Sequence, residues 1–351
     1  MTIRVAVIGA GYFASFHINA WLRLPFVELT TVIEPDTTKH SALRTKLNTS
    51  GSPQTIITDT TKTLEPSMVD LIDIATPPHT HAALITECIA LQSQCIICQK
   101  PFCGSLQNAQ EVQKLIDNSN TTVVVHENFR FQPWYREIKK QIDNNHLGDI
   151  LQASFRLRTG DGQGDNAYLA RQPYFRNMKQ FLIHETGVHF IDVFRYLFGE
   201  PQAVSADLGR LNPAISGEDF GHFIFYYDSG QRAHFDGNRL LDHPADNTRL
   251  TMGELLIEGT EGSLSLSGSG KILLRKFGSK NWQTVQYAFE DTDFGGDCVY
   301  QLQKHVVEHL QTQSLLENDA ASYLKNLQIE HLIYQSASEH RQLQIPSGNT
   351  L

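Results

Sequence analysis

The first 126 residues alternate short apolar runs with segments whose apolar residues recur at helical spacing. The apolar runs have the length and composition of strands buried on both faces, and they cover residues 4–8, 29–33, 71–75, 95–98 and 122–125. The segments between them are long enough for helices, as shown by Ile85, Cys88 and Ile89 at i, i+3, i+4. Strands that alternate with such helices need crossover connections, which are right-handed in proteins. Residues 1–126 are therefore predicted to form a doubly wound α/β domain with a parallel sheet.

The chain after residue 126 has a different pattern. Helices are predicted at 133–145 and at 187–198, where Gly199 ends the second one. Strands are predicted at hairpin spacing, at 150–158, 203–211, 219–227, 231–237, 254–258, 263–267, 272–277 and 284–287. Two further helices are predicted at 298–311 and 320–340. Residues 127–351 are therefore predicted to form an α+β domain with an open, mostly antiparallel sheet.

The net negative charge of the chain argues against some classes of binding partner. The chain has 29 Lys and Arg residues against 38 Asp and Glu residues, so it has no excess of positive charge to attract nucleic acid or an anionic membrane. No stretch approaches the ~20 apolar residues of a membrane helix, and the N-terminus lacks the pattern of a signal peptide. We expect a small-molecule ligand and neither nucleic acid nor membrane as partner.

The cysteines favour a reducing compartment. Their number, five, is odd and does not suit a framework of disulfides, so a cytoplasmic protein is expected. Cys95 and Cys98 have the spacing of a metal or redox motif. They lie within a predicted buried strand, however, where residues three apart point to opposite faces. They are predicted to be core side chains.

A glycine motif, Gly9-Ala10-Gly11-Tyr12-Phe13-Ala14, follows the first predicted strand and opens a helix. Gly9 allows a tight turn, Gly11 lets the backbone approach a pyrophosphate, and Ala14 permits close helix packing. The helix N-terminus offers N–H groups to the phosphates. Glu34 ends the second strand, where it can accept hydrogen bonds from both ribose hydroxyls and would repel a 2′-phosphate. The motif predicts a dinucleotide site that prefers NAD to NADP.

Two further segments carry residues suited to hydride-transfer chemistry. Lys100 follows a predicted strand at the sheet edge where ligands bind, and it could stabilise a developing alkoxide. Glu185, His189 and Asp192 are spaced to lie on one helix face, and a neutral His189 could accept a hydroxyl proton. A structural histidine held by Asp192 is the alternative. Because His184 and His189 are five residues apart, the spacing of a zinc-protease helix is absent and no metal is expected.

Ordered motifs along most of the chain resemble those of one oxidoreductase family. They are the glycine motif, Thr76-Pro77-x-x-x-His81, Lys100-Pro101, Asn128-x-Arg130-x-x-Pro133 and Glu185-x-Gly187-x-His189-x-x-Asp192. In this order they are similar to the motifs of the Gfo/Idh/MocA family. The resemblance implies a Rossmann domain, a second domain built on an open mixed sheet, a bound nicotinamide cofactor, and sugars, polyols or related alcohols as substrates.

The resemblance also implies roles for matching residues. Lys100 and His189 would be the catalytic pair, and Glu185 a carboxylate that contacts the substrate or a neighbouring group. The expected cofactor contacts are Gly9, Gly11, Tyr12, Phe13, Ala14, Glu34, Thr76, Pro77, His81, Gln99 and Lys100. The expected substrate contacts are Asn128, Arg130, Trp134, Glu185, His189 and Asp192. Ordinary packing is the alternative for Trp134.

Three residues depart from the family pattern. Gln99 stands where Glu is usual, Glu185 where Asp is usual, and Pro78 where Asn is common. Gln99 removes a negative charge beside Lys100, which changes the contacts expected there. Glu185 only lengthens the carboxylate arm, so the chemistry is retained.

The segments 126–135 and 181–189 look most like a branch of the family that oxidises an aldose such as D-apiose at its anomeric carbon to a lactone. The loop 160–166 carries Asp161, Asp165 and Asn166, acceptors suited to the hydroxyls of a neutral sugar, although a solvated loop is equally consistent. Apart from Arg130, the proposed site segments show no basic cluster for a phosphate. We expect a small unphosphorylated aldose as substrate.

Other functions stay open at this point. The chain could oxidise another polyol or sugar, such as inositol or a sugar nucleotide, or it could be an NAD-dependent glycosidase of the same family that reoxidises its cofactor in each turnover. A regulator that only senses nicotinamide is disfavoured, because a sensor needs neither Lys100 nor His189.

The predicted strand at 219–227 has apolar residues on both faces, which indicates that the chain forms an oligomer with itself. Phe223, Phe225 and Tyr227 lie on one face of it, and Ile224 and Tyr226 lie on the other. One layer of helices would leave an apolar face uncovered, so a homodimer or homotetramer is expected.

Overall fold

The computed structural model describes residues 2–66 and 68–346. These residues form two compact units. One unit holds the described residues up to Asn128 together with Cys298–Lys325, and the other holds Phe129–Asp297 together with the described residues from Asn326 onward. Within the described part of the chain, no helix combines the length and the apolar character needed to cross a membrane.

The predicted extent of the second domain is wrong in one respect, because the chain returns to the first unit at Cys298. Helix α7 (Cys298–Thr312) packs against α1 (Ala14–Arg23). Gln303 of α7 donates from Nε2 to the backbone oxygen of His17 at 3.3 Å. The apolar spacing of α7 predicts a helix, but it does not indicate which unit the helix covers.

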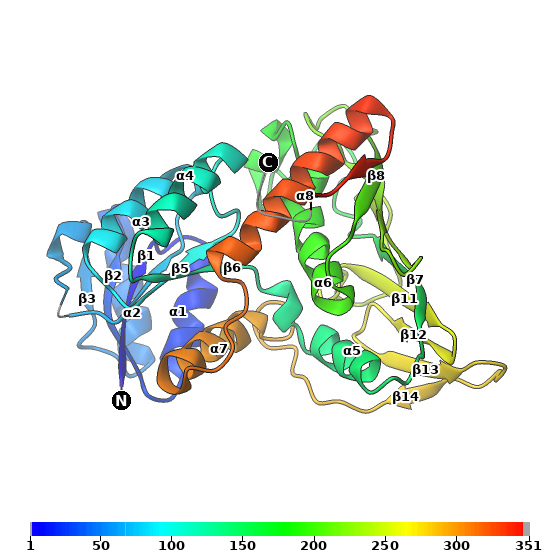
Figure 1. Cartoon of the computed structure of the whole chain (residues 1–351). Helices are drawn as coiled ribbons and strands as arrows, with labels where there is room; N and C mark the ends of the chain where they lie inside the picture. The colour runs from blue at the N-terminus through cyan, green and yellow to red at the C-terminus, as the bar shows by residue number, and fades with distance from the viewer. Residues whose placement is uncertain (1, 67, 347–351) are drawn as a thin grey trace. The chain divides into compact units, whose positions relative to one another are not determined.

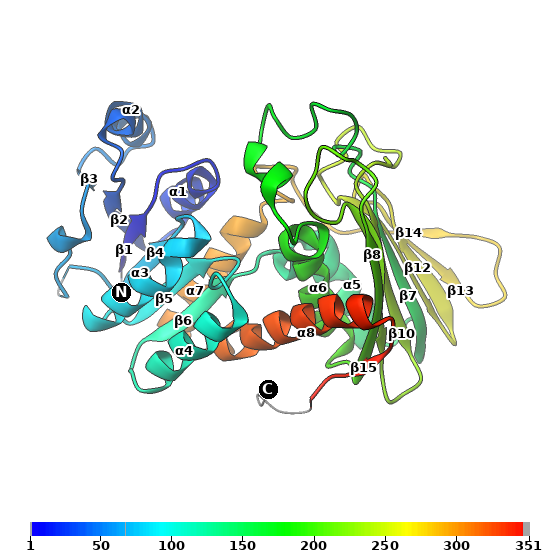
Figure 2. The same cartoon turned by 90° about the horizontal axis from the view of Figure 1, so that it is seen from above.

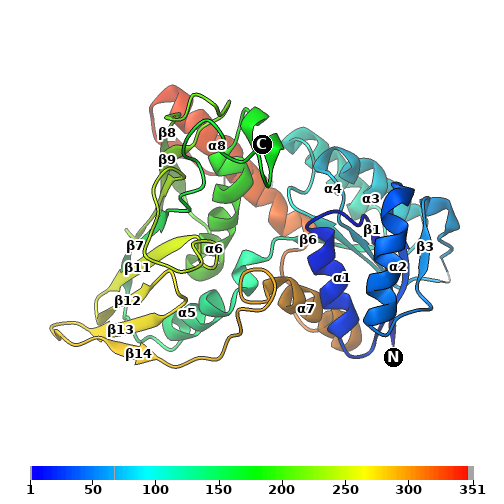
Figure 3. The same ribbon diagram turned by 180° about the vertical axis from the view of Figure 1, so that it is seen from behind.

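The first unit is built on a parallel six-stranded sheet with the order β3-β2-β1-β4-β5-β6. Its strands are β1 (Ile3–Ile8), β2 (Val27–Ile33), β3 (Ile56–Thr58), β4 (Leu71–Ile74), β5 (Cys95–Gln99) and β6 (Thr122–His126). Figures 2 and 3 show α1 and α2 (His40–Thr49) on one face, and α3 (His81–Ala90) and α4 (Leu106–Asp117) on the other. The predicted doubly wound fold is confirmed. Only β3, an edge strand of three residues, lacks a recognisable pattern in the sequence.

The strand order positions the candidate nucleotide site. It reverses between β1 and β4, and in open α/β sheets ligands bind at such a switch point, beyond the carboxyl ends of the strands. The glycine motif follows β1, Thr76 follows β4, and Lys100 follows β5. All three segments therefore lie at the same edge of the sheet.

The second unit is built on a mixed nine-stranded sheet with the order β14-β13-β12-β11-β7-β10-β9-β8-β15. Within this sheet, β7 and β10 form the one parallel pair among the described strands, and the other pairs are antiparallel. The strands are β7 (Ile150–Leu157), β8 (Ala203–Gly209), β9 (Phe220–Tyr226), β10 (Arg232–Asn238), β11 (Gly253–Gly259), β12 (Gly262–Leu266), β13 (Ile272–Lys276), β14 (Gln283–Val285) and β15 (Leu343–Gln344). The predicted open, mostly antiparallel sheet is confirmed.

Helices cover one face of this sheet. Figures 1 and 2 show α5 (Pro133–Asp143), α6 (Val188–Phe198) and the later part of α8 (Ala320–Glu339) on that face. Phe223 and Phe225 of β9 point into the layer between sheet and helices and are fully buried, whereas Ile224 and Tyr226 alternate with them and are half-buried. The alternation predicted for this strand is therefore present.

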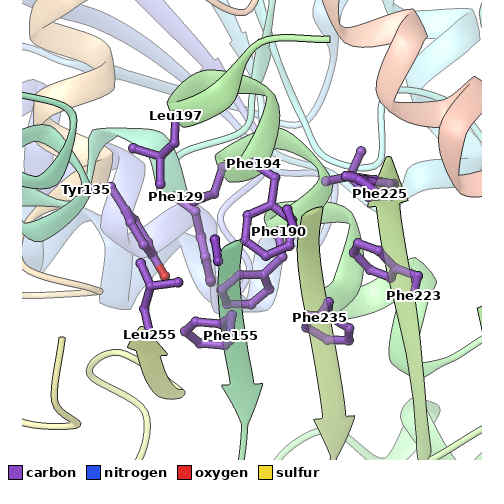
Figure 4. Close-up of a cluster of buried hydrophobic side chains, with 14 of the residues drawn as sticks. Phe129, Tyr135, Phe155, Phe190, Phe194, Leu197, Phe223, Phe225, Phe235 and Leu255 are labelled. Atoms are coloured by element: carbon purple, nitrogen blue, oxygen red, sulfur yellow. The ribbon is translucent and has the colours of Figure 1, made fainter. Parts of the chain in front are cut away.

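The core of the second unit is aromatic (Figure 4). The ring of Phe190 on α6 stacks on Phe155 of β7 with centroids 3.9 Å apart, and Phe223 stacks on Phe235 of β10 at 4.9 Å. Truncating such a side chain to alanine typically costs about 3–5 kcal/mol of stability. This core fixes α6, which carries His189, against the sheet.

The cysteines are core residues, as predicted for Cys95 and Cys98. Both lie in β5 and are fully buried. All five cysteines are buried thiols. Burial raises the pKa of the Cys95 thiol to about 12, so it remains a thiol at neutral pH.

Candidate active site

The glycine turn after β1 is shaped for a ligand. Gly9 has φ +108°, and a Cβ there would lie 2.5 Å from the backbone oxygen of Ala75, so only glycine fits. At Gly11 a Cβ would meet no protein atom within 4 Å. Packing inside the protein therefore does not explain Gly11, whereas the close approach of a ligand's pyrophosphate does. Helix α1 begins at Ala14 with no side-chain cap, which leaves its N-terminus open to an anion.

Glu34 lies beside this turn, directly after β2. Its Oε2 accepts a hydrogen bond from the backbone N–H of Ala10 at 2.9 Å, and its Oε1 accepts one from Asp36 at 3.0 Å. The carboxylate is buried but retains lone pairs for ribose hydroxyls. Lys39, which the sequence analysis overlooks, places Nζ 3.4 Å from Glu34 Oε1. Its charge weakens the repulsion that Glu34 would exert on a 2′-phosphate.

The segments after β4 and β5 are tied together by His81. Its ring is fully buried, with Nδ1 2.9 Å from the backbone oxygen of Pro101 and Nε2 2.9 Å from that of Thr76. Burial lowers the pKa of His81, so the neutral ring carries one N–H, which donates to one of these two oxygens while the other nitrogen only packs against its oxygen. The prediction that His81 contacts the cofactor is therefore corrected, because both ring nitrogens face backbone oxygens. His81 instead holds Thr76 near the residue that follows Lys100.

Gln99 ends β5 and Lys100 follows it at the same edge, and both side chains are half-buried. Gln99 Oε1 is buried and accepts no hydrogen bond from any described residue. A buried amide oxygen without a donor is costly, so a donor from a bound ligand would stabilise it. The open space at Gly11 and the unpaired oxygen of Gln99 both fit the binding of a nicotinamide dinucleotide at the carboxyl ends of the strands.

The second unit presents Glu185 and His189 on two consecutive helical segments. Residues Leu182–Gly187 form a π-helical turn, and α6 (Val188–Phe198) continues from it to Gly199, as the predicted helix at 187–198 requires. π-Helical turns are rare and are frequent at functional sites. Glu185 is half-buried in the turn, and His189 lies in the first turn of α6.

The π-helical turn is anchored by side chains distant in sequence. Glu218 Oε1 accepts a hydrogen bond from the backbone N–H of Phe181 at 3.0 Å. Tyr334 Oη donates to the same oxygen of Glu218 at 2.6 Å and accepts from the backbone N–H of His184 at 3.1 Å. The Nδ1 atom of His184 lies 2.6 Å from Glu330 Oε1. These contacts fix the backbone that carries Glu185.

His189 is held through the face of its ring. The ring of Phe129 stacks on it with centroids 3.8 Å apart and an interplanar angle of 3°. His189 is only 6% exposed. Stacking restricts the imidazole to one plane, so its ring nitrogens have defined directions. Such an orientation is what a general base needs.

Arg130 and Asp192, predicted to contact the substrate, instead pair with each other. Arg130 donates from Nε and Nη2 to the two oxygens of Asp192 at 2.8 and 2.7 Å. Asn326 Nδ2 donates to Asp192 Oδ1 at 2.9 Å, and Asp192 is fully buried. The pair joins the 3₁₀ turn Phe129–Phe131 to α6, which is a structural role, and contact with the substrate stays a prediction.

For Trp134 the structure favours the packing alternative. Trp134 on α5 is fully buried, and its ring packs edge-on against Phe289 with centroids 5.8 Å apart. Asn128, the last residue of the first unit before the chain enters the second, is 2% exposed.

The loop 160–166 is held by arginines that the sequence analysis misses. Asp161 Oδ2 accepts from Arg239 Nη2 at 2.9 Å and from Arg171 Nη2 at 3.3 Å. Burial opposes ionisation of Asp161, but the charge of Arg239 and the hydrogen bond from Thr159 outweigh it and lower the pKa. Sequence spacing does not reveal these two arginines beside the loop, since their contacts span up to 78 residues of sequence.

The described residues contain no group of three or more His, Cys, Asp or Glu side chains that could hold a metal ion. His184 is engaged with Glu330 through Nδ1.

Comparisons with known proteins place the chain among NAD-binding oxidoreductases. Residues 3–127 match the model of an oxidoreductase family with an NAD-binding Rossmann fold, and residues 135–265 match the GFO/IDH/MocA C-terminal domain. The chain belongs to the Gfo/Idh/MocA family of oxidoreductases. The family and the NAD cofactor predicted from the sequence are confirmed.

Similar proteins include two D-apiose dehydrogenases. The one from Paraburkholderia graminis is 26% identical over 361 residues, covering 97% of this chain and 89% of the relative. The one from Rhizobium rhizogenes is 24% identical, covering 98% of this chain and 97% of the relative. A crystal structure of an oxidoreductase from Agrobacterium radiobacter in complex with NAD+, L-tartaric acid and magnesium has a TM-score of 0.86 at 22% identity, covering 98% of this chain and 99% of that chain. This structural likeness confirms the fold.

Proposed function

We propose that the protein is an NAD-dependent sugar dehydrogenase that oxidises a small unphosphorylated aldose at its anomeric carbon to a lactone. The observation that carries the proposal is the fixed His189, stacked on Phe129 in the turn of helix that follows the anchored Glu185. A histidine held in this way suits proton transfer from a hydroxyl near neutral pH. The two D-apiose dehydrogenases that match nearly the whole chain support an aldose as substrate.

The residues of the first unit would hold the cofactor. The open N-terminus of α1 and the backbone at Gly11 would receive the pyrophosphate, and Glu34 would accept from the adenosine ribose hydroxyls. Thr76, Pro77, Gln99 and Lys100 belong to the edge where the nicotinamide half would lie. NAD, when bound, supplies the acceptor for the hydride.

Three side chains would divide the work on the sugar. His189 accepts the proton of the anomeric hydroxyl, and Lys100 stabilises the developing alkoxide. Glu185 accepts hydrogen bonds from neighbouring hydroxyls of the sugar. An anomeric hydroxyl is acidified by the ring oxygen, so this set needs no metal ion to remove its proton.

The charges of the second unit support a neutral substrate. Arg171 and Arg239 carry two positive charges, and both contact Asp161. The charges of Glu185, Arg171 and Arg239 all act on Tyr174, so the cluster of Arg171, Arg239, Asp161 and Glu185 holds two charges of each sign. The cluster therefore has no net charge to attract a phosphate. Tyr174 is 56% exposed, and burial of part of the side chain, with the negative charge of Glu185, raises the pKa of its hydroxyl to about 12. A neutral phenol offers both a donor and an acceptor to a sugar.

The experiment is to incubate the protein with NAD and a panel of sugars, and to follow NADH absorbance. We expect steady NADH formation with D-apiose or another small aldose, and a product that alkaline hydroxylamine traps as a lactone. Cleavage of a glycoside without net NADH would indicate the glycosidase alternative. Activity only on inositols, phosphorylated sugars or sugar nucleotides would contradict the substrate proposal and leave the family assignment intact.

A further inference from the structure

Arg239 is a buried cation that joins the segments around Glu185. It directly follows β10 and is 4% exposed. Its Nε donates to Tyr168 Oη at 2.8 Å, its Nη1 to Thr186 Oγ1 at 2.8 Å, and its Nη2 to Asp161 Oδ2 at 2.9 Å. One guanidinium thus connects the loop 160–166, the residue Tyr168 and the π-helical turn.

Aromatic rings enclose the same guanidinium. Its central carbon lies 4.8 Å from the ring centroid of Phe181, 5.3 Å from that of Tyr168 and 5.5 Å from that of Phe175. Rings at these distances attract a desolvated cation. A lysine could not reproduce this arrangement, because its single ammonium group lacks the planar fork that reaches three acceptors.

These contacts bear on the residues proposed to act on the sugar. Thr186 is the residue after Glu185 in the π-helical turn, and His189 follows three residues later. Phe175, which lies over Arg239, packs edge-on against Tyr174 with ring centroids 4.9 Å apart. Arg239 therefore contacts the backbone segment of Glu185 on one side and supports Tyr174 on the other.

We propose that Arg239 is a positioning residue of the dehydrogenase site, which acts by holding Thr186, and with it Glu185 and His189, in the geometry that the reaction needs. The inference rests on the function proposed above. It differs from a purely structural role, because loss of a single Arg239 contact should impair turnover more than it impairs folding.

The test compares three variants. Arg239→Lys keeps the positive charge and loses the fork, and Thr186→Val removes only the hydroxyl that accepts from Arg239. Thr251→Val is the matched control, since the buried Thr251 hydroxyl in the same unit donates to the backbone oxygens of Gly253 and Gly268 instead. Thr186→Val also keeps the test open if Arg239→Lys fails to fold. The measurements are kcat and KM for the sugar, NADH affinity by fluorescence titration, and amide hydrogen exchange of residues 182–187.

We expect Arg239→Lys and Thr186→Val each to lower kcat/KM by about 10-fold or more, with NADH affinity unchanged. Exchange at 182–187 should accelerate in both variants and stay at the wild-type rate in Thr251→Val. The kcat/KM of the double variant Arg239→Lys/Thr186→Val should be no lower than that of Arg239→Lys alone, because both changes remove the same contact.

Two results would overturn the proposal. One is exchange at 182–187 that matches the Thr251→Val control in both variants. The other is faster exchange with unchanged kcat/KM. If the wild-type protein oxidises no sugar, the function proposed above fails, and the exchange measurement alone then decides whether Arg239 holds the turn.

Discussion

The buried pair of Arg130 and Asp192 leads to a quantitative prediction about stability. Asp192 is fully buried, and it accepts two charge-assisted hydrogen bonds from Arg130 and one from Asn326. Each hydrogen bond from the charged Arg130 is worth about 1.5–3 kcal/mol, and the hydrogen bond from the Asn326 side chain is worth about 1 kcal/mol. The guanidinium of Arg130 is 11% exposed, so water can replace only part of what is lost. Asp192→Ala should therefore lower the free energy of unfolding by about 3–5 kcal/mol.

The assay is urea unfolding followed by tryptophan fluorescence, in which Trp134 reports from the same unit. Glu308→Ala is the control, because Glu308 pairs with Lys304 at 3.6 Å on the surface and both side chains are about half exposed. This change should cost less than about 0.5 kcal/mol. The double variant Arg130→Met/Asp192→Leu should be more stable than Asp192→Ala, because it leaves no unpaired buried charge. A loss of about 1 kcal/mol or less for Asp192→Ala would refute the reasoning, as would a double variant no more stable than the single one.

Three further predictions concern the cofactor, the catalytic pair and assembly. Glu34 should make the protein bind NADH more tightly than NADPH in a fluorescence titration, and Lys39→Ala should widen the difference; equal affinities in the wild type would contradict the role of Glu34. His189→Ala and Lys100→Ala should each lower turnover by about 100-fold or more while NAD binding persists, and near-normal turnover in either would assign the chemistry to other residues. The half-buried Ile224 and Tyr226, on the sheet face opposite Phe223 and Phe225, predict a dimer or tetramer, so a monomer in light scattering at micromolar concentration would argue against an interface there.

Much of the fold could be predicted because burial leaves a direct mark on the sequence. Strands such as β5 lie inside the sheet and read as continuous apolar runs, and β9 alternates because its two faces differ. Helix α7 shows what such patterns omit: its apolar face was recognised, but not that this face packs against α1. The identity of a packing partner depends on the path of the chain, which local spacing does not contain.

Only part of the candidate site could be predicted from the sequence, because some of its residues depend on partners that are distant along the chain. The tight turn predicted at Gly9 is present, and the space at Gly11 fits the predicted approach of a pyrophosphate, because both properties are local to the backbone. Arg130 was assigned to the substrate, because its partner Asp192 is 62 residues away. Arg239 went unnoticed, because nothing near it in the sequence reveals contacts with Asp161 and Thr186. Polar residues with distant partners are those that sequence reasoning places least well.

The central claim is that a hydride leaves the anomeric carbon of an aldose. The most direct test uses the aldose that gives NADH most rapidly, labelled with deuterium at that carbon, and measures the mass of the reduced cofactor. The account predicts that the reduced cofactor carries one deuterium and that the sugar product is the unlabelled lactone. Reduced cofactor without deuterium, formed from a sugar that keeps its label, would show that the hydride comes from another carbon and would contradict the account.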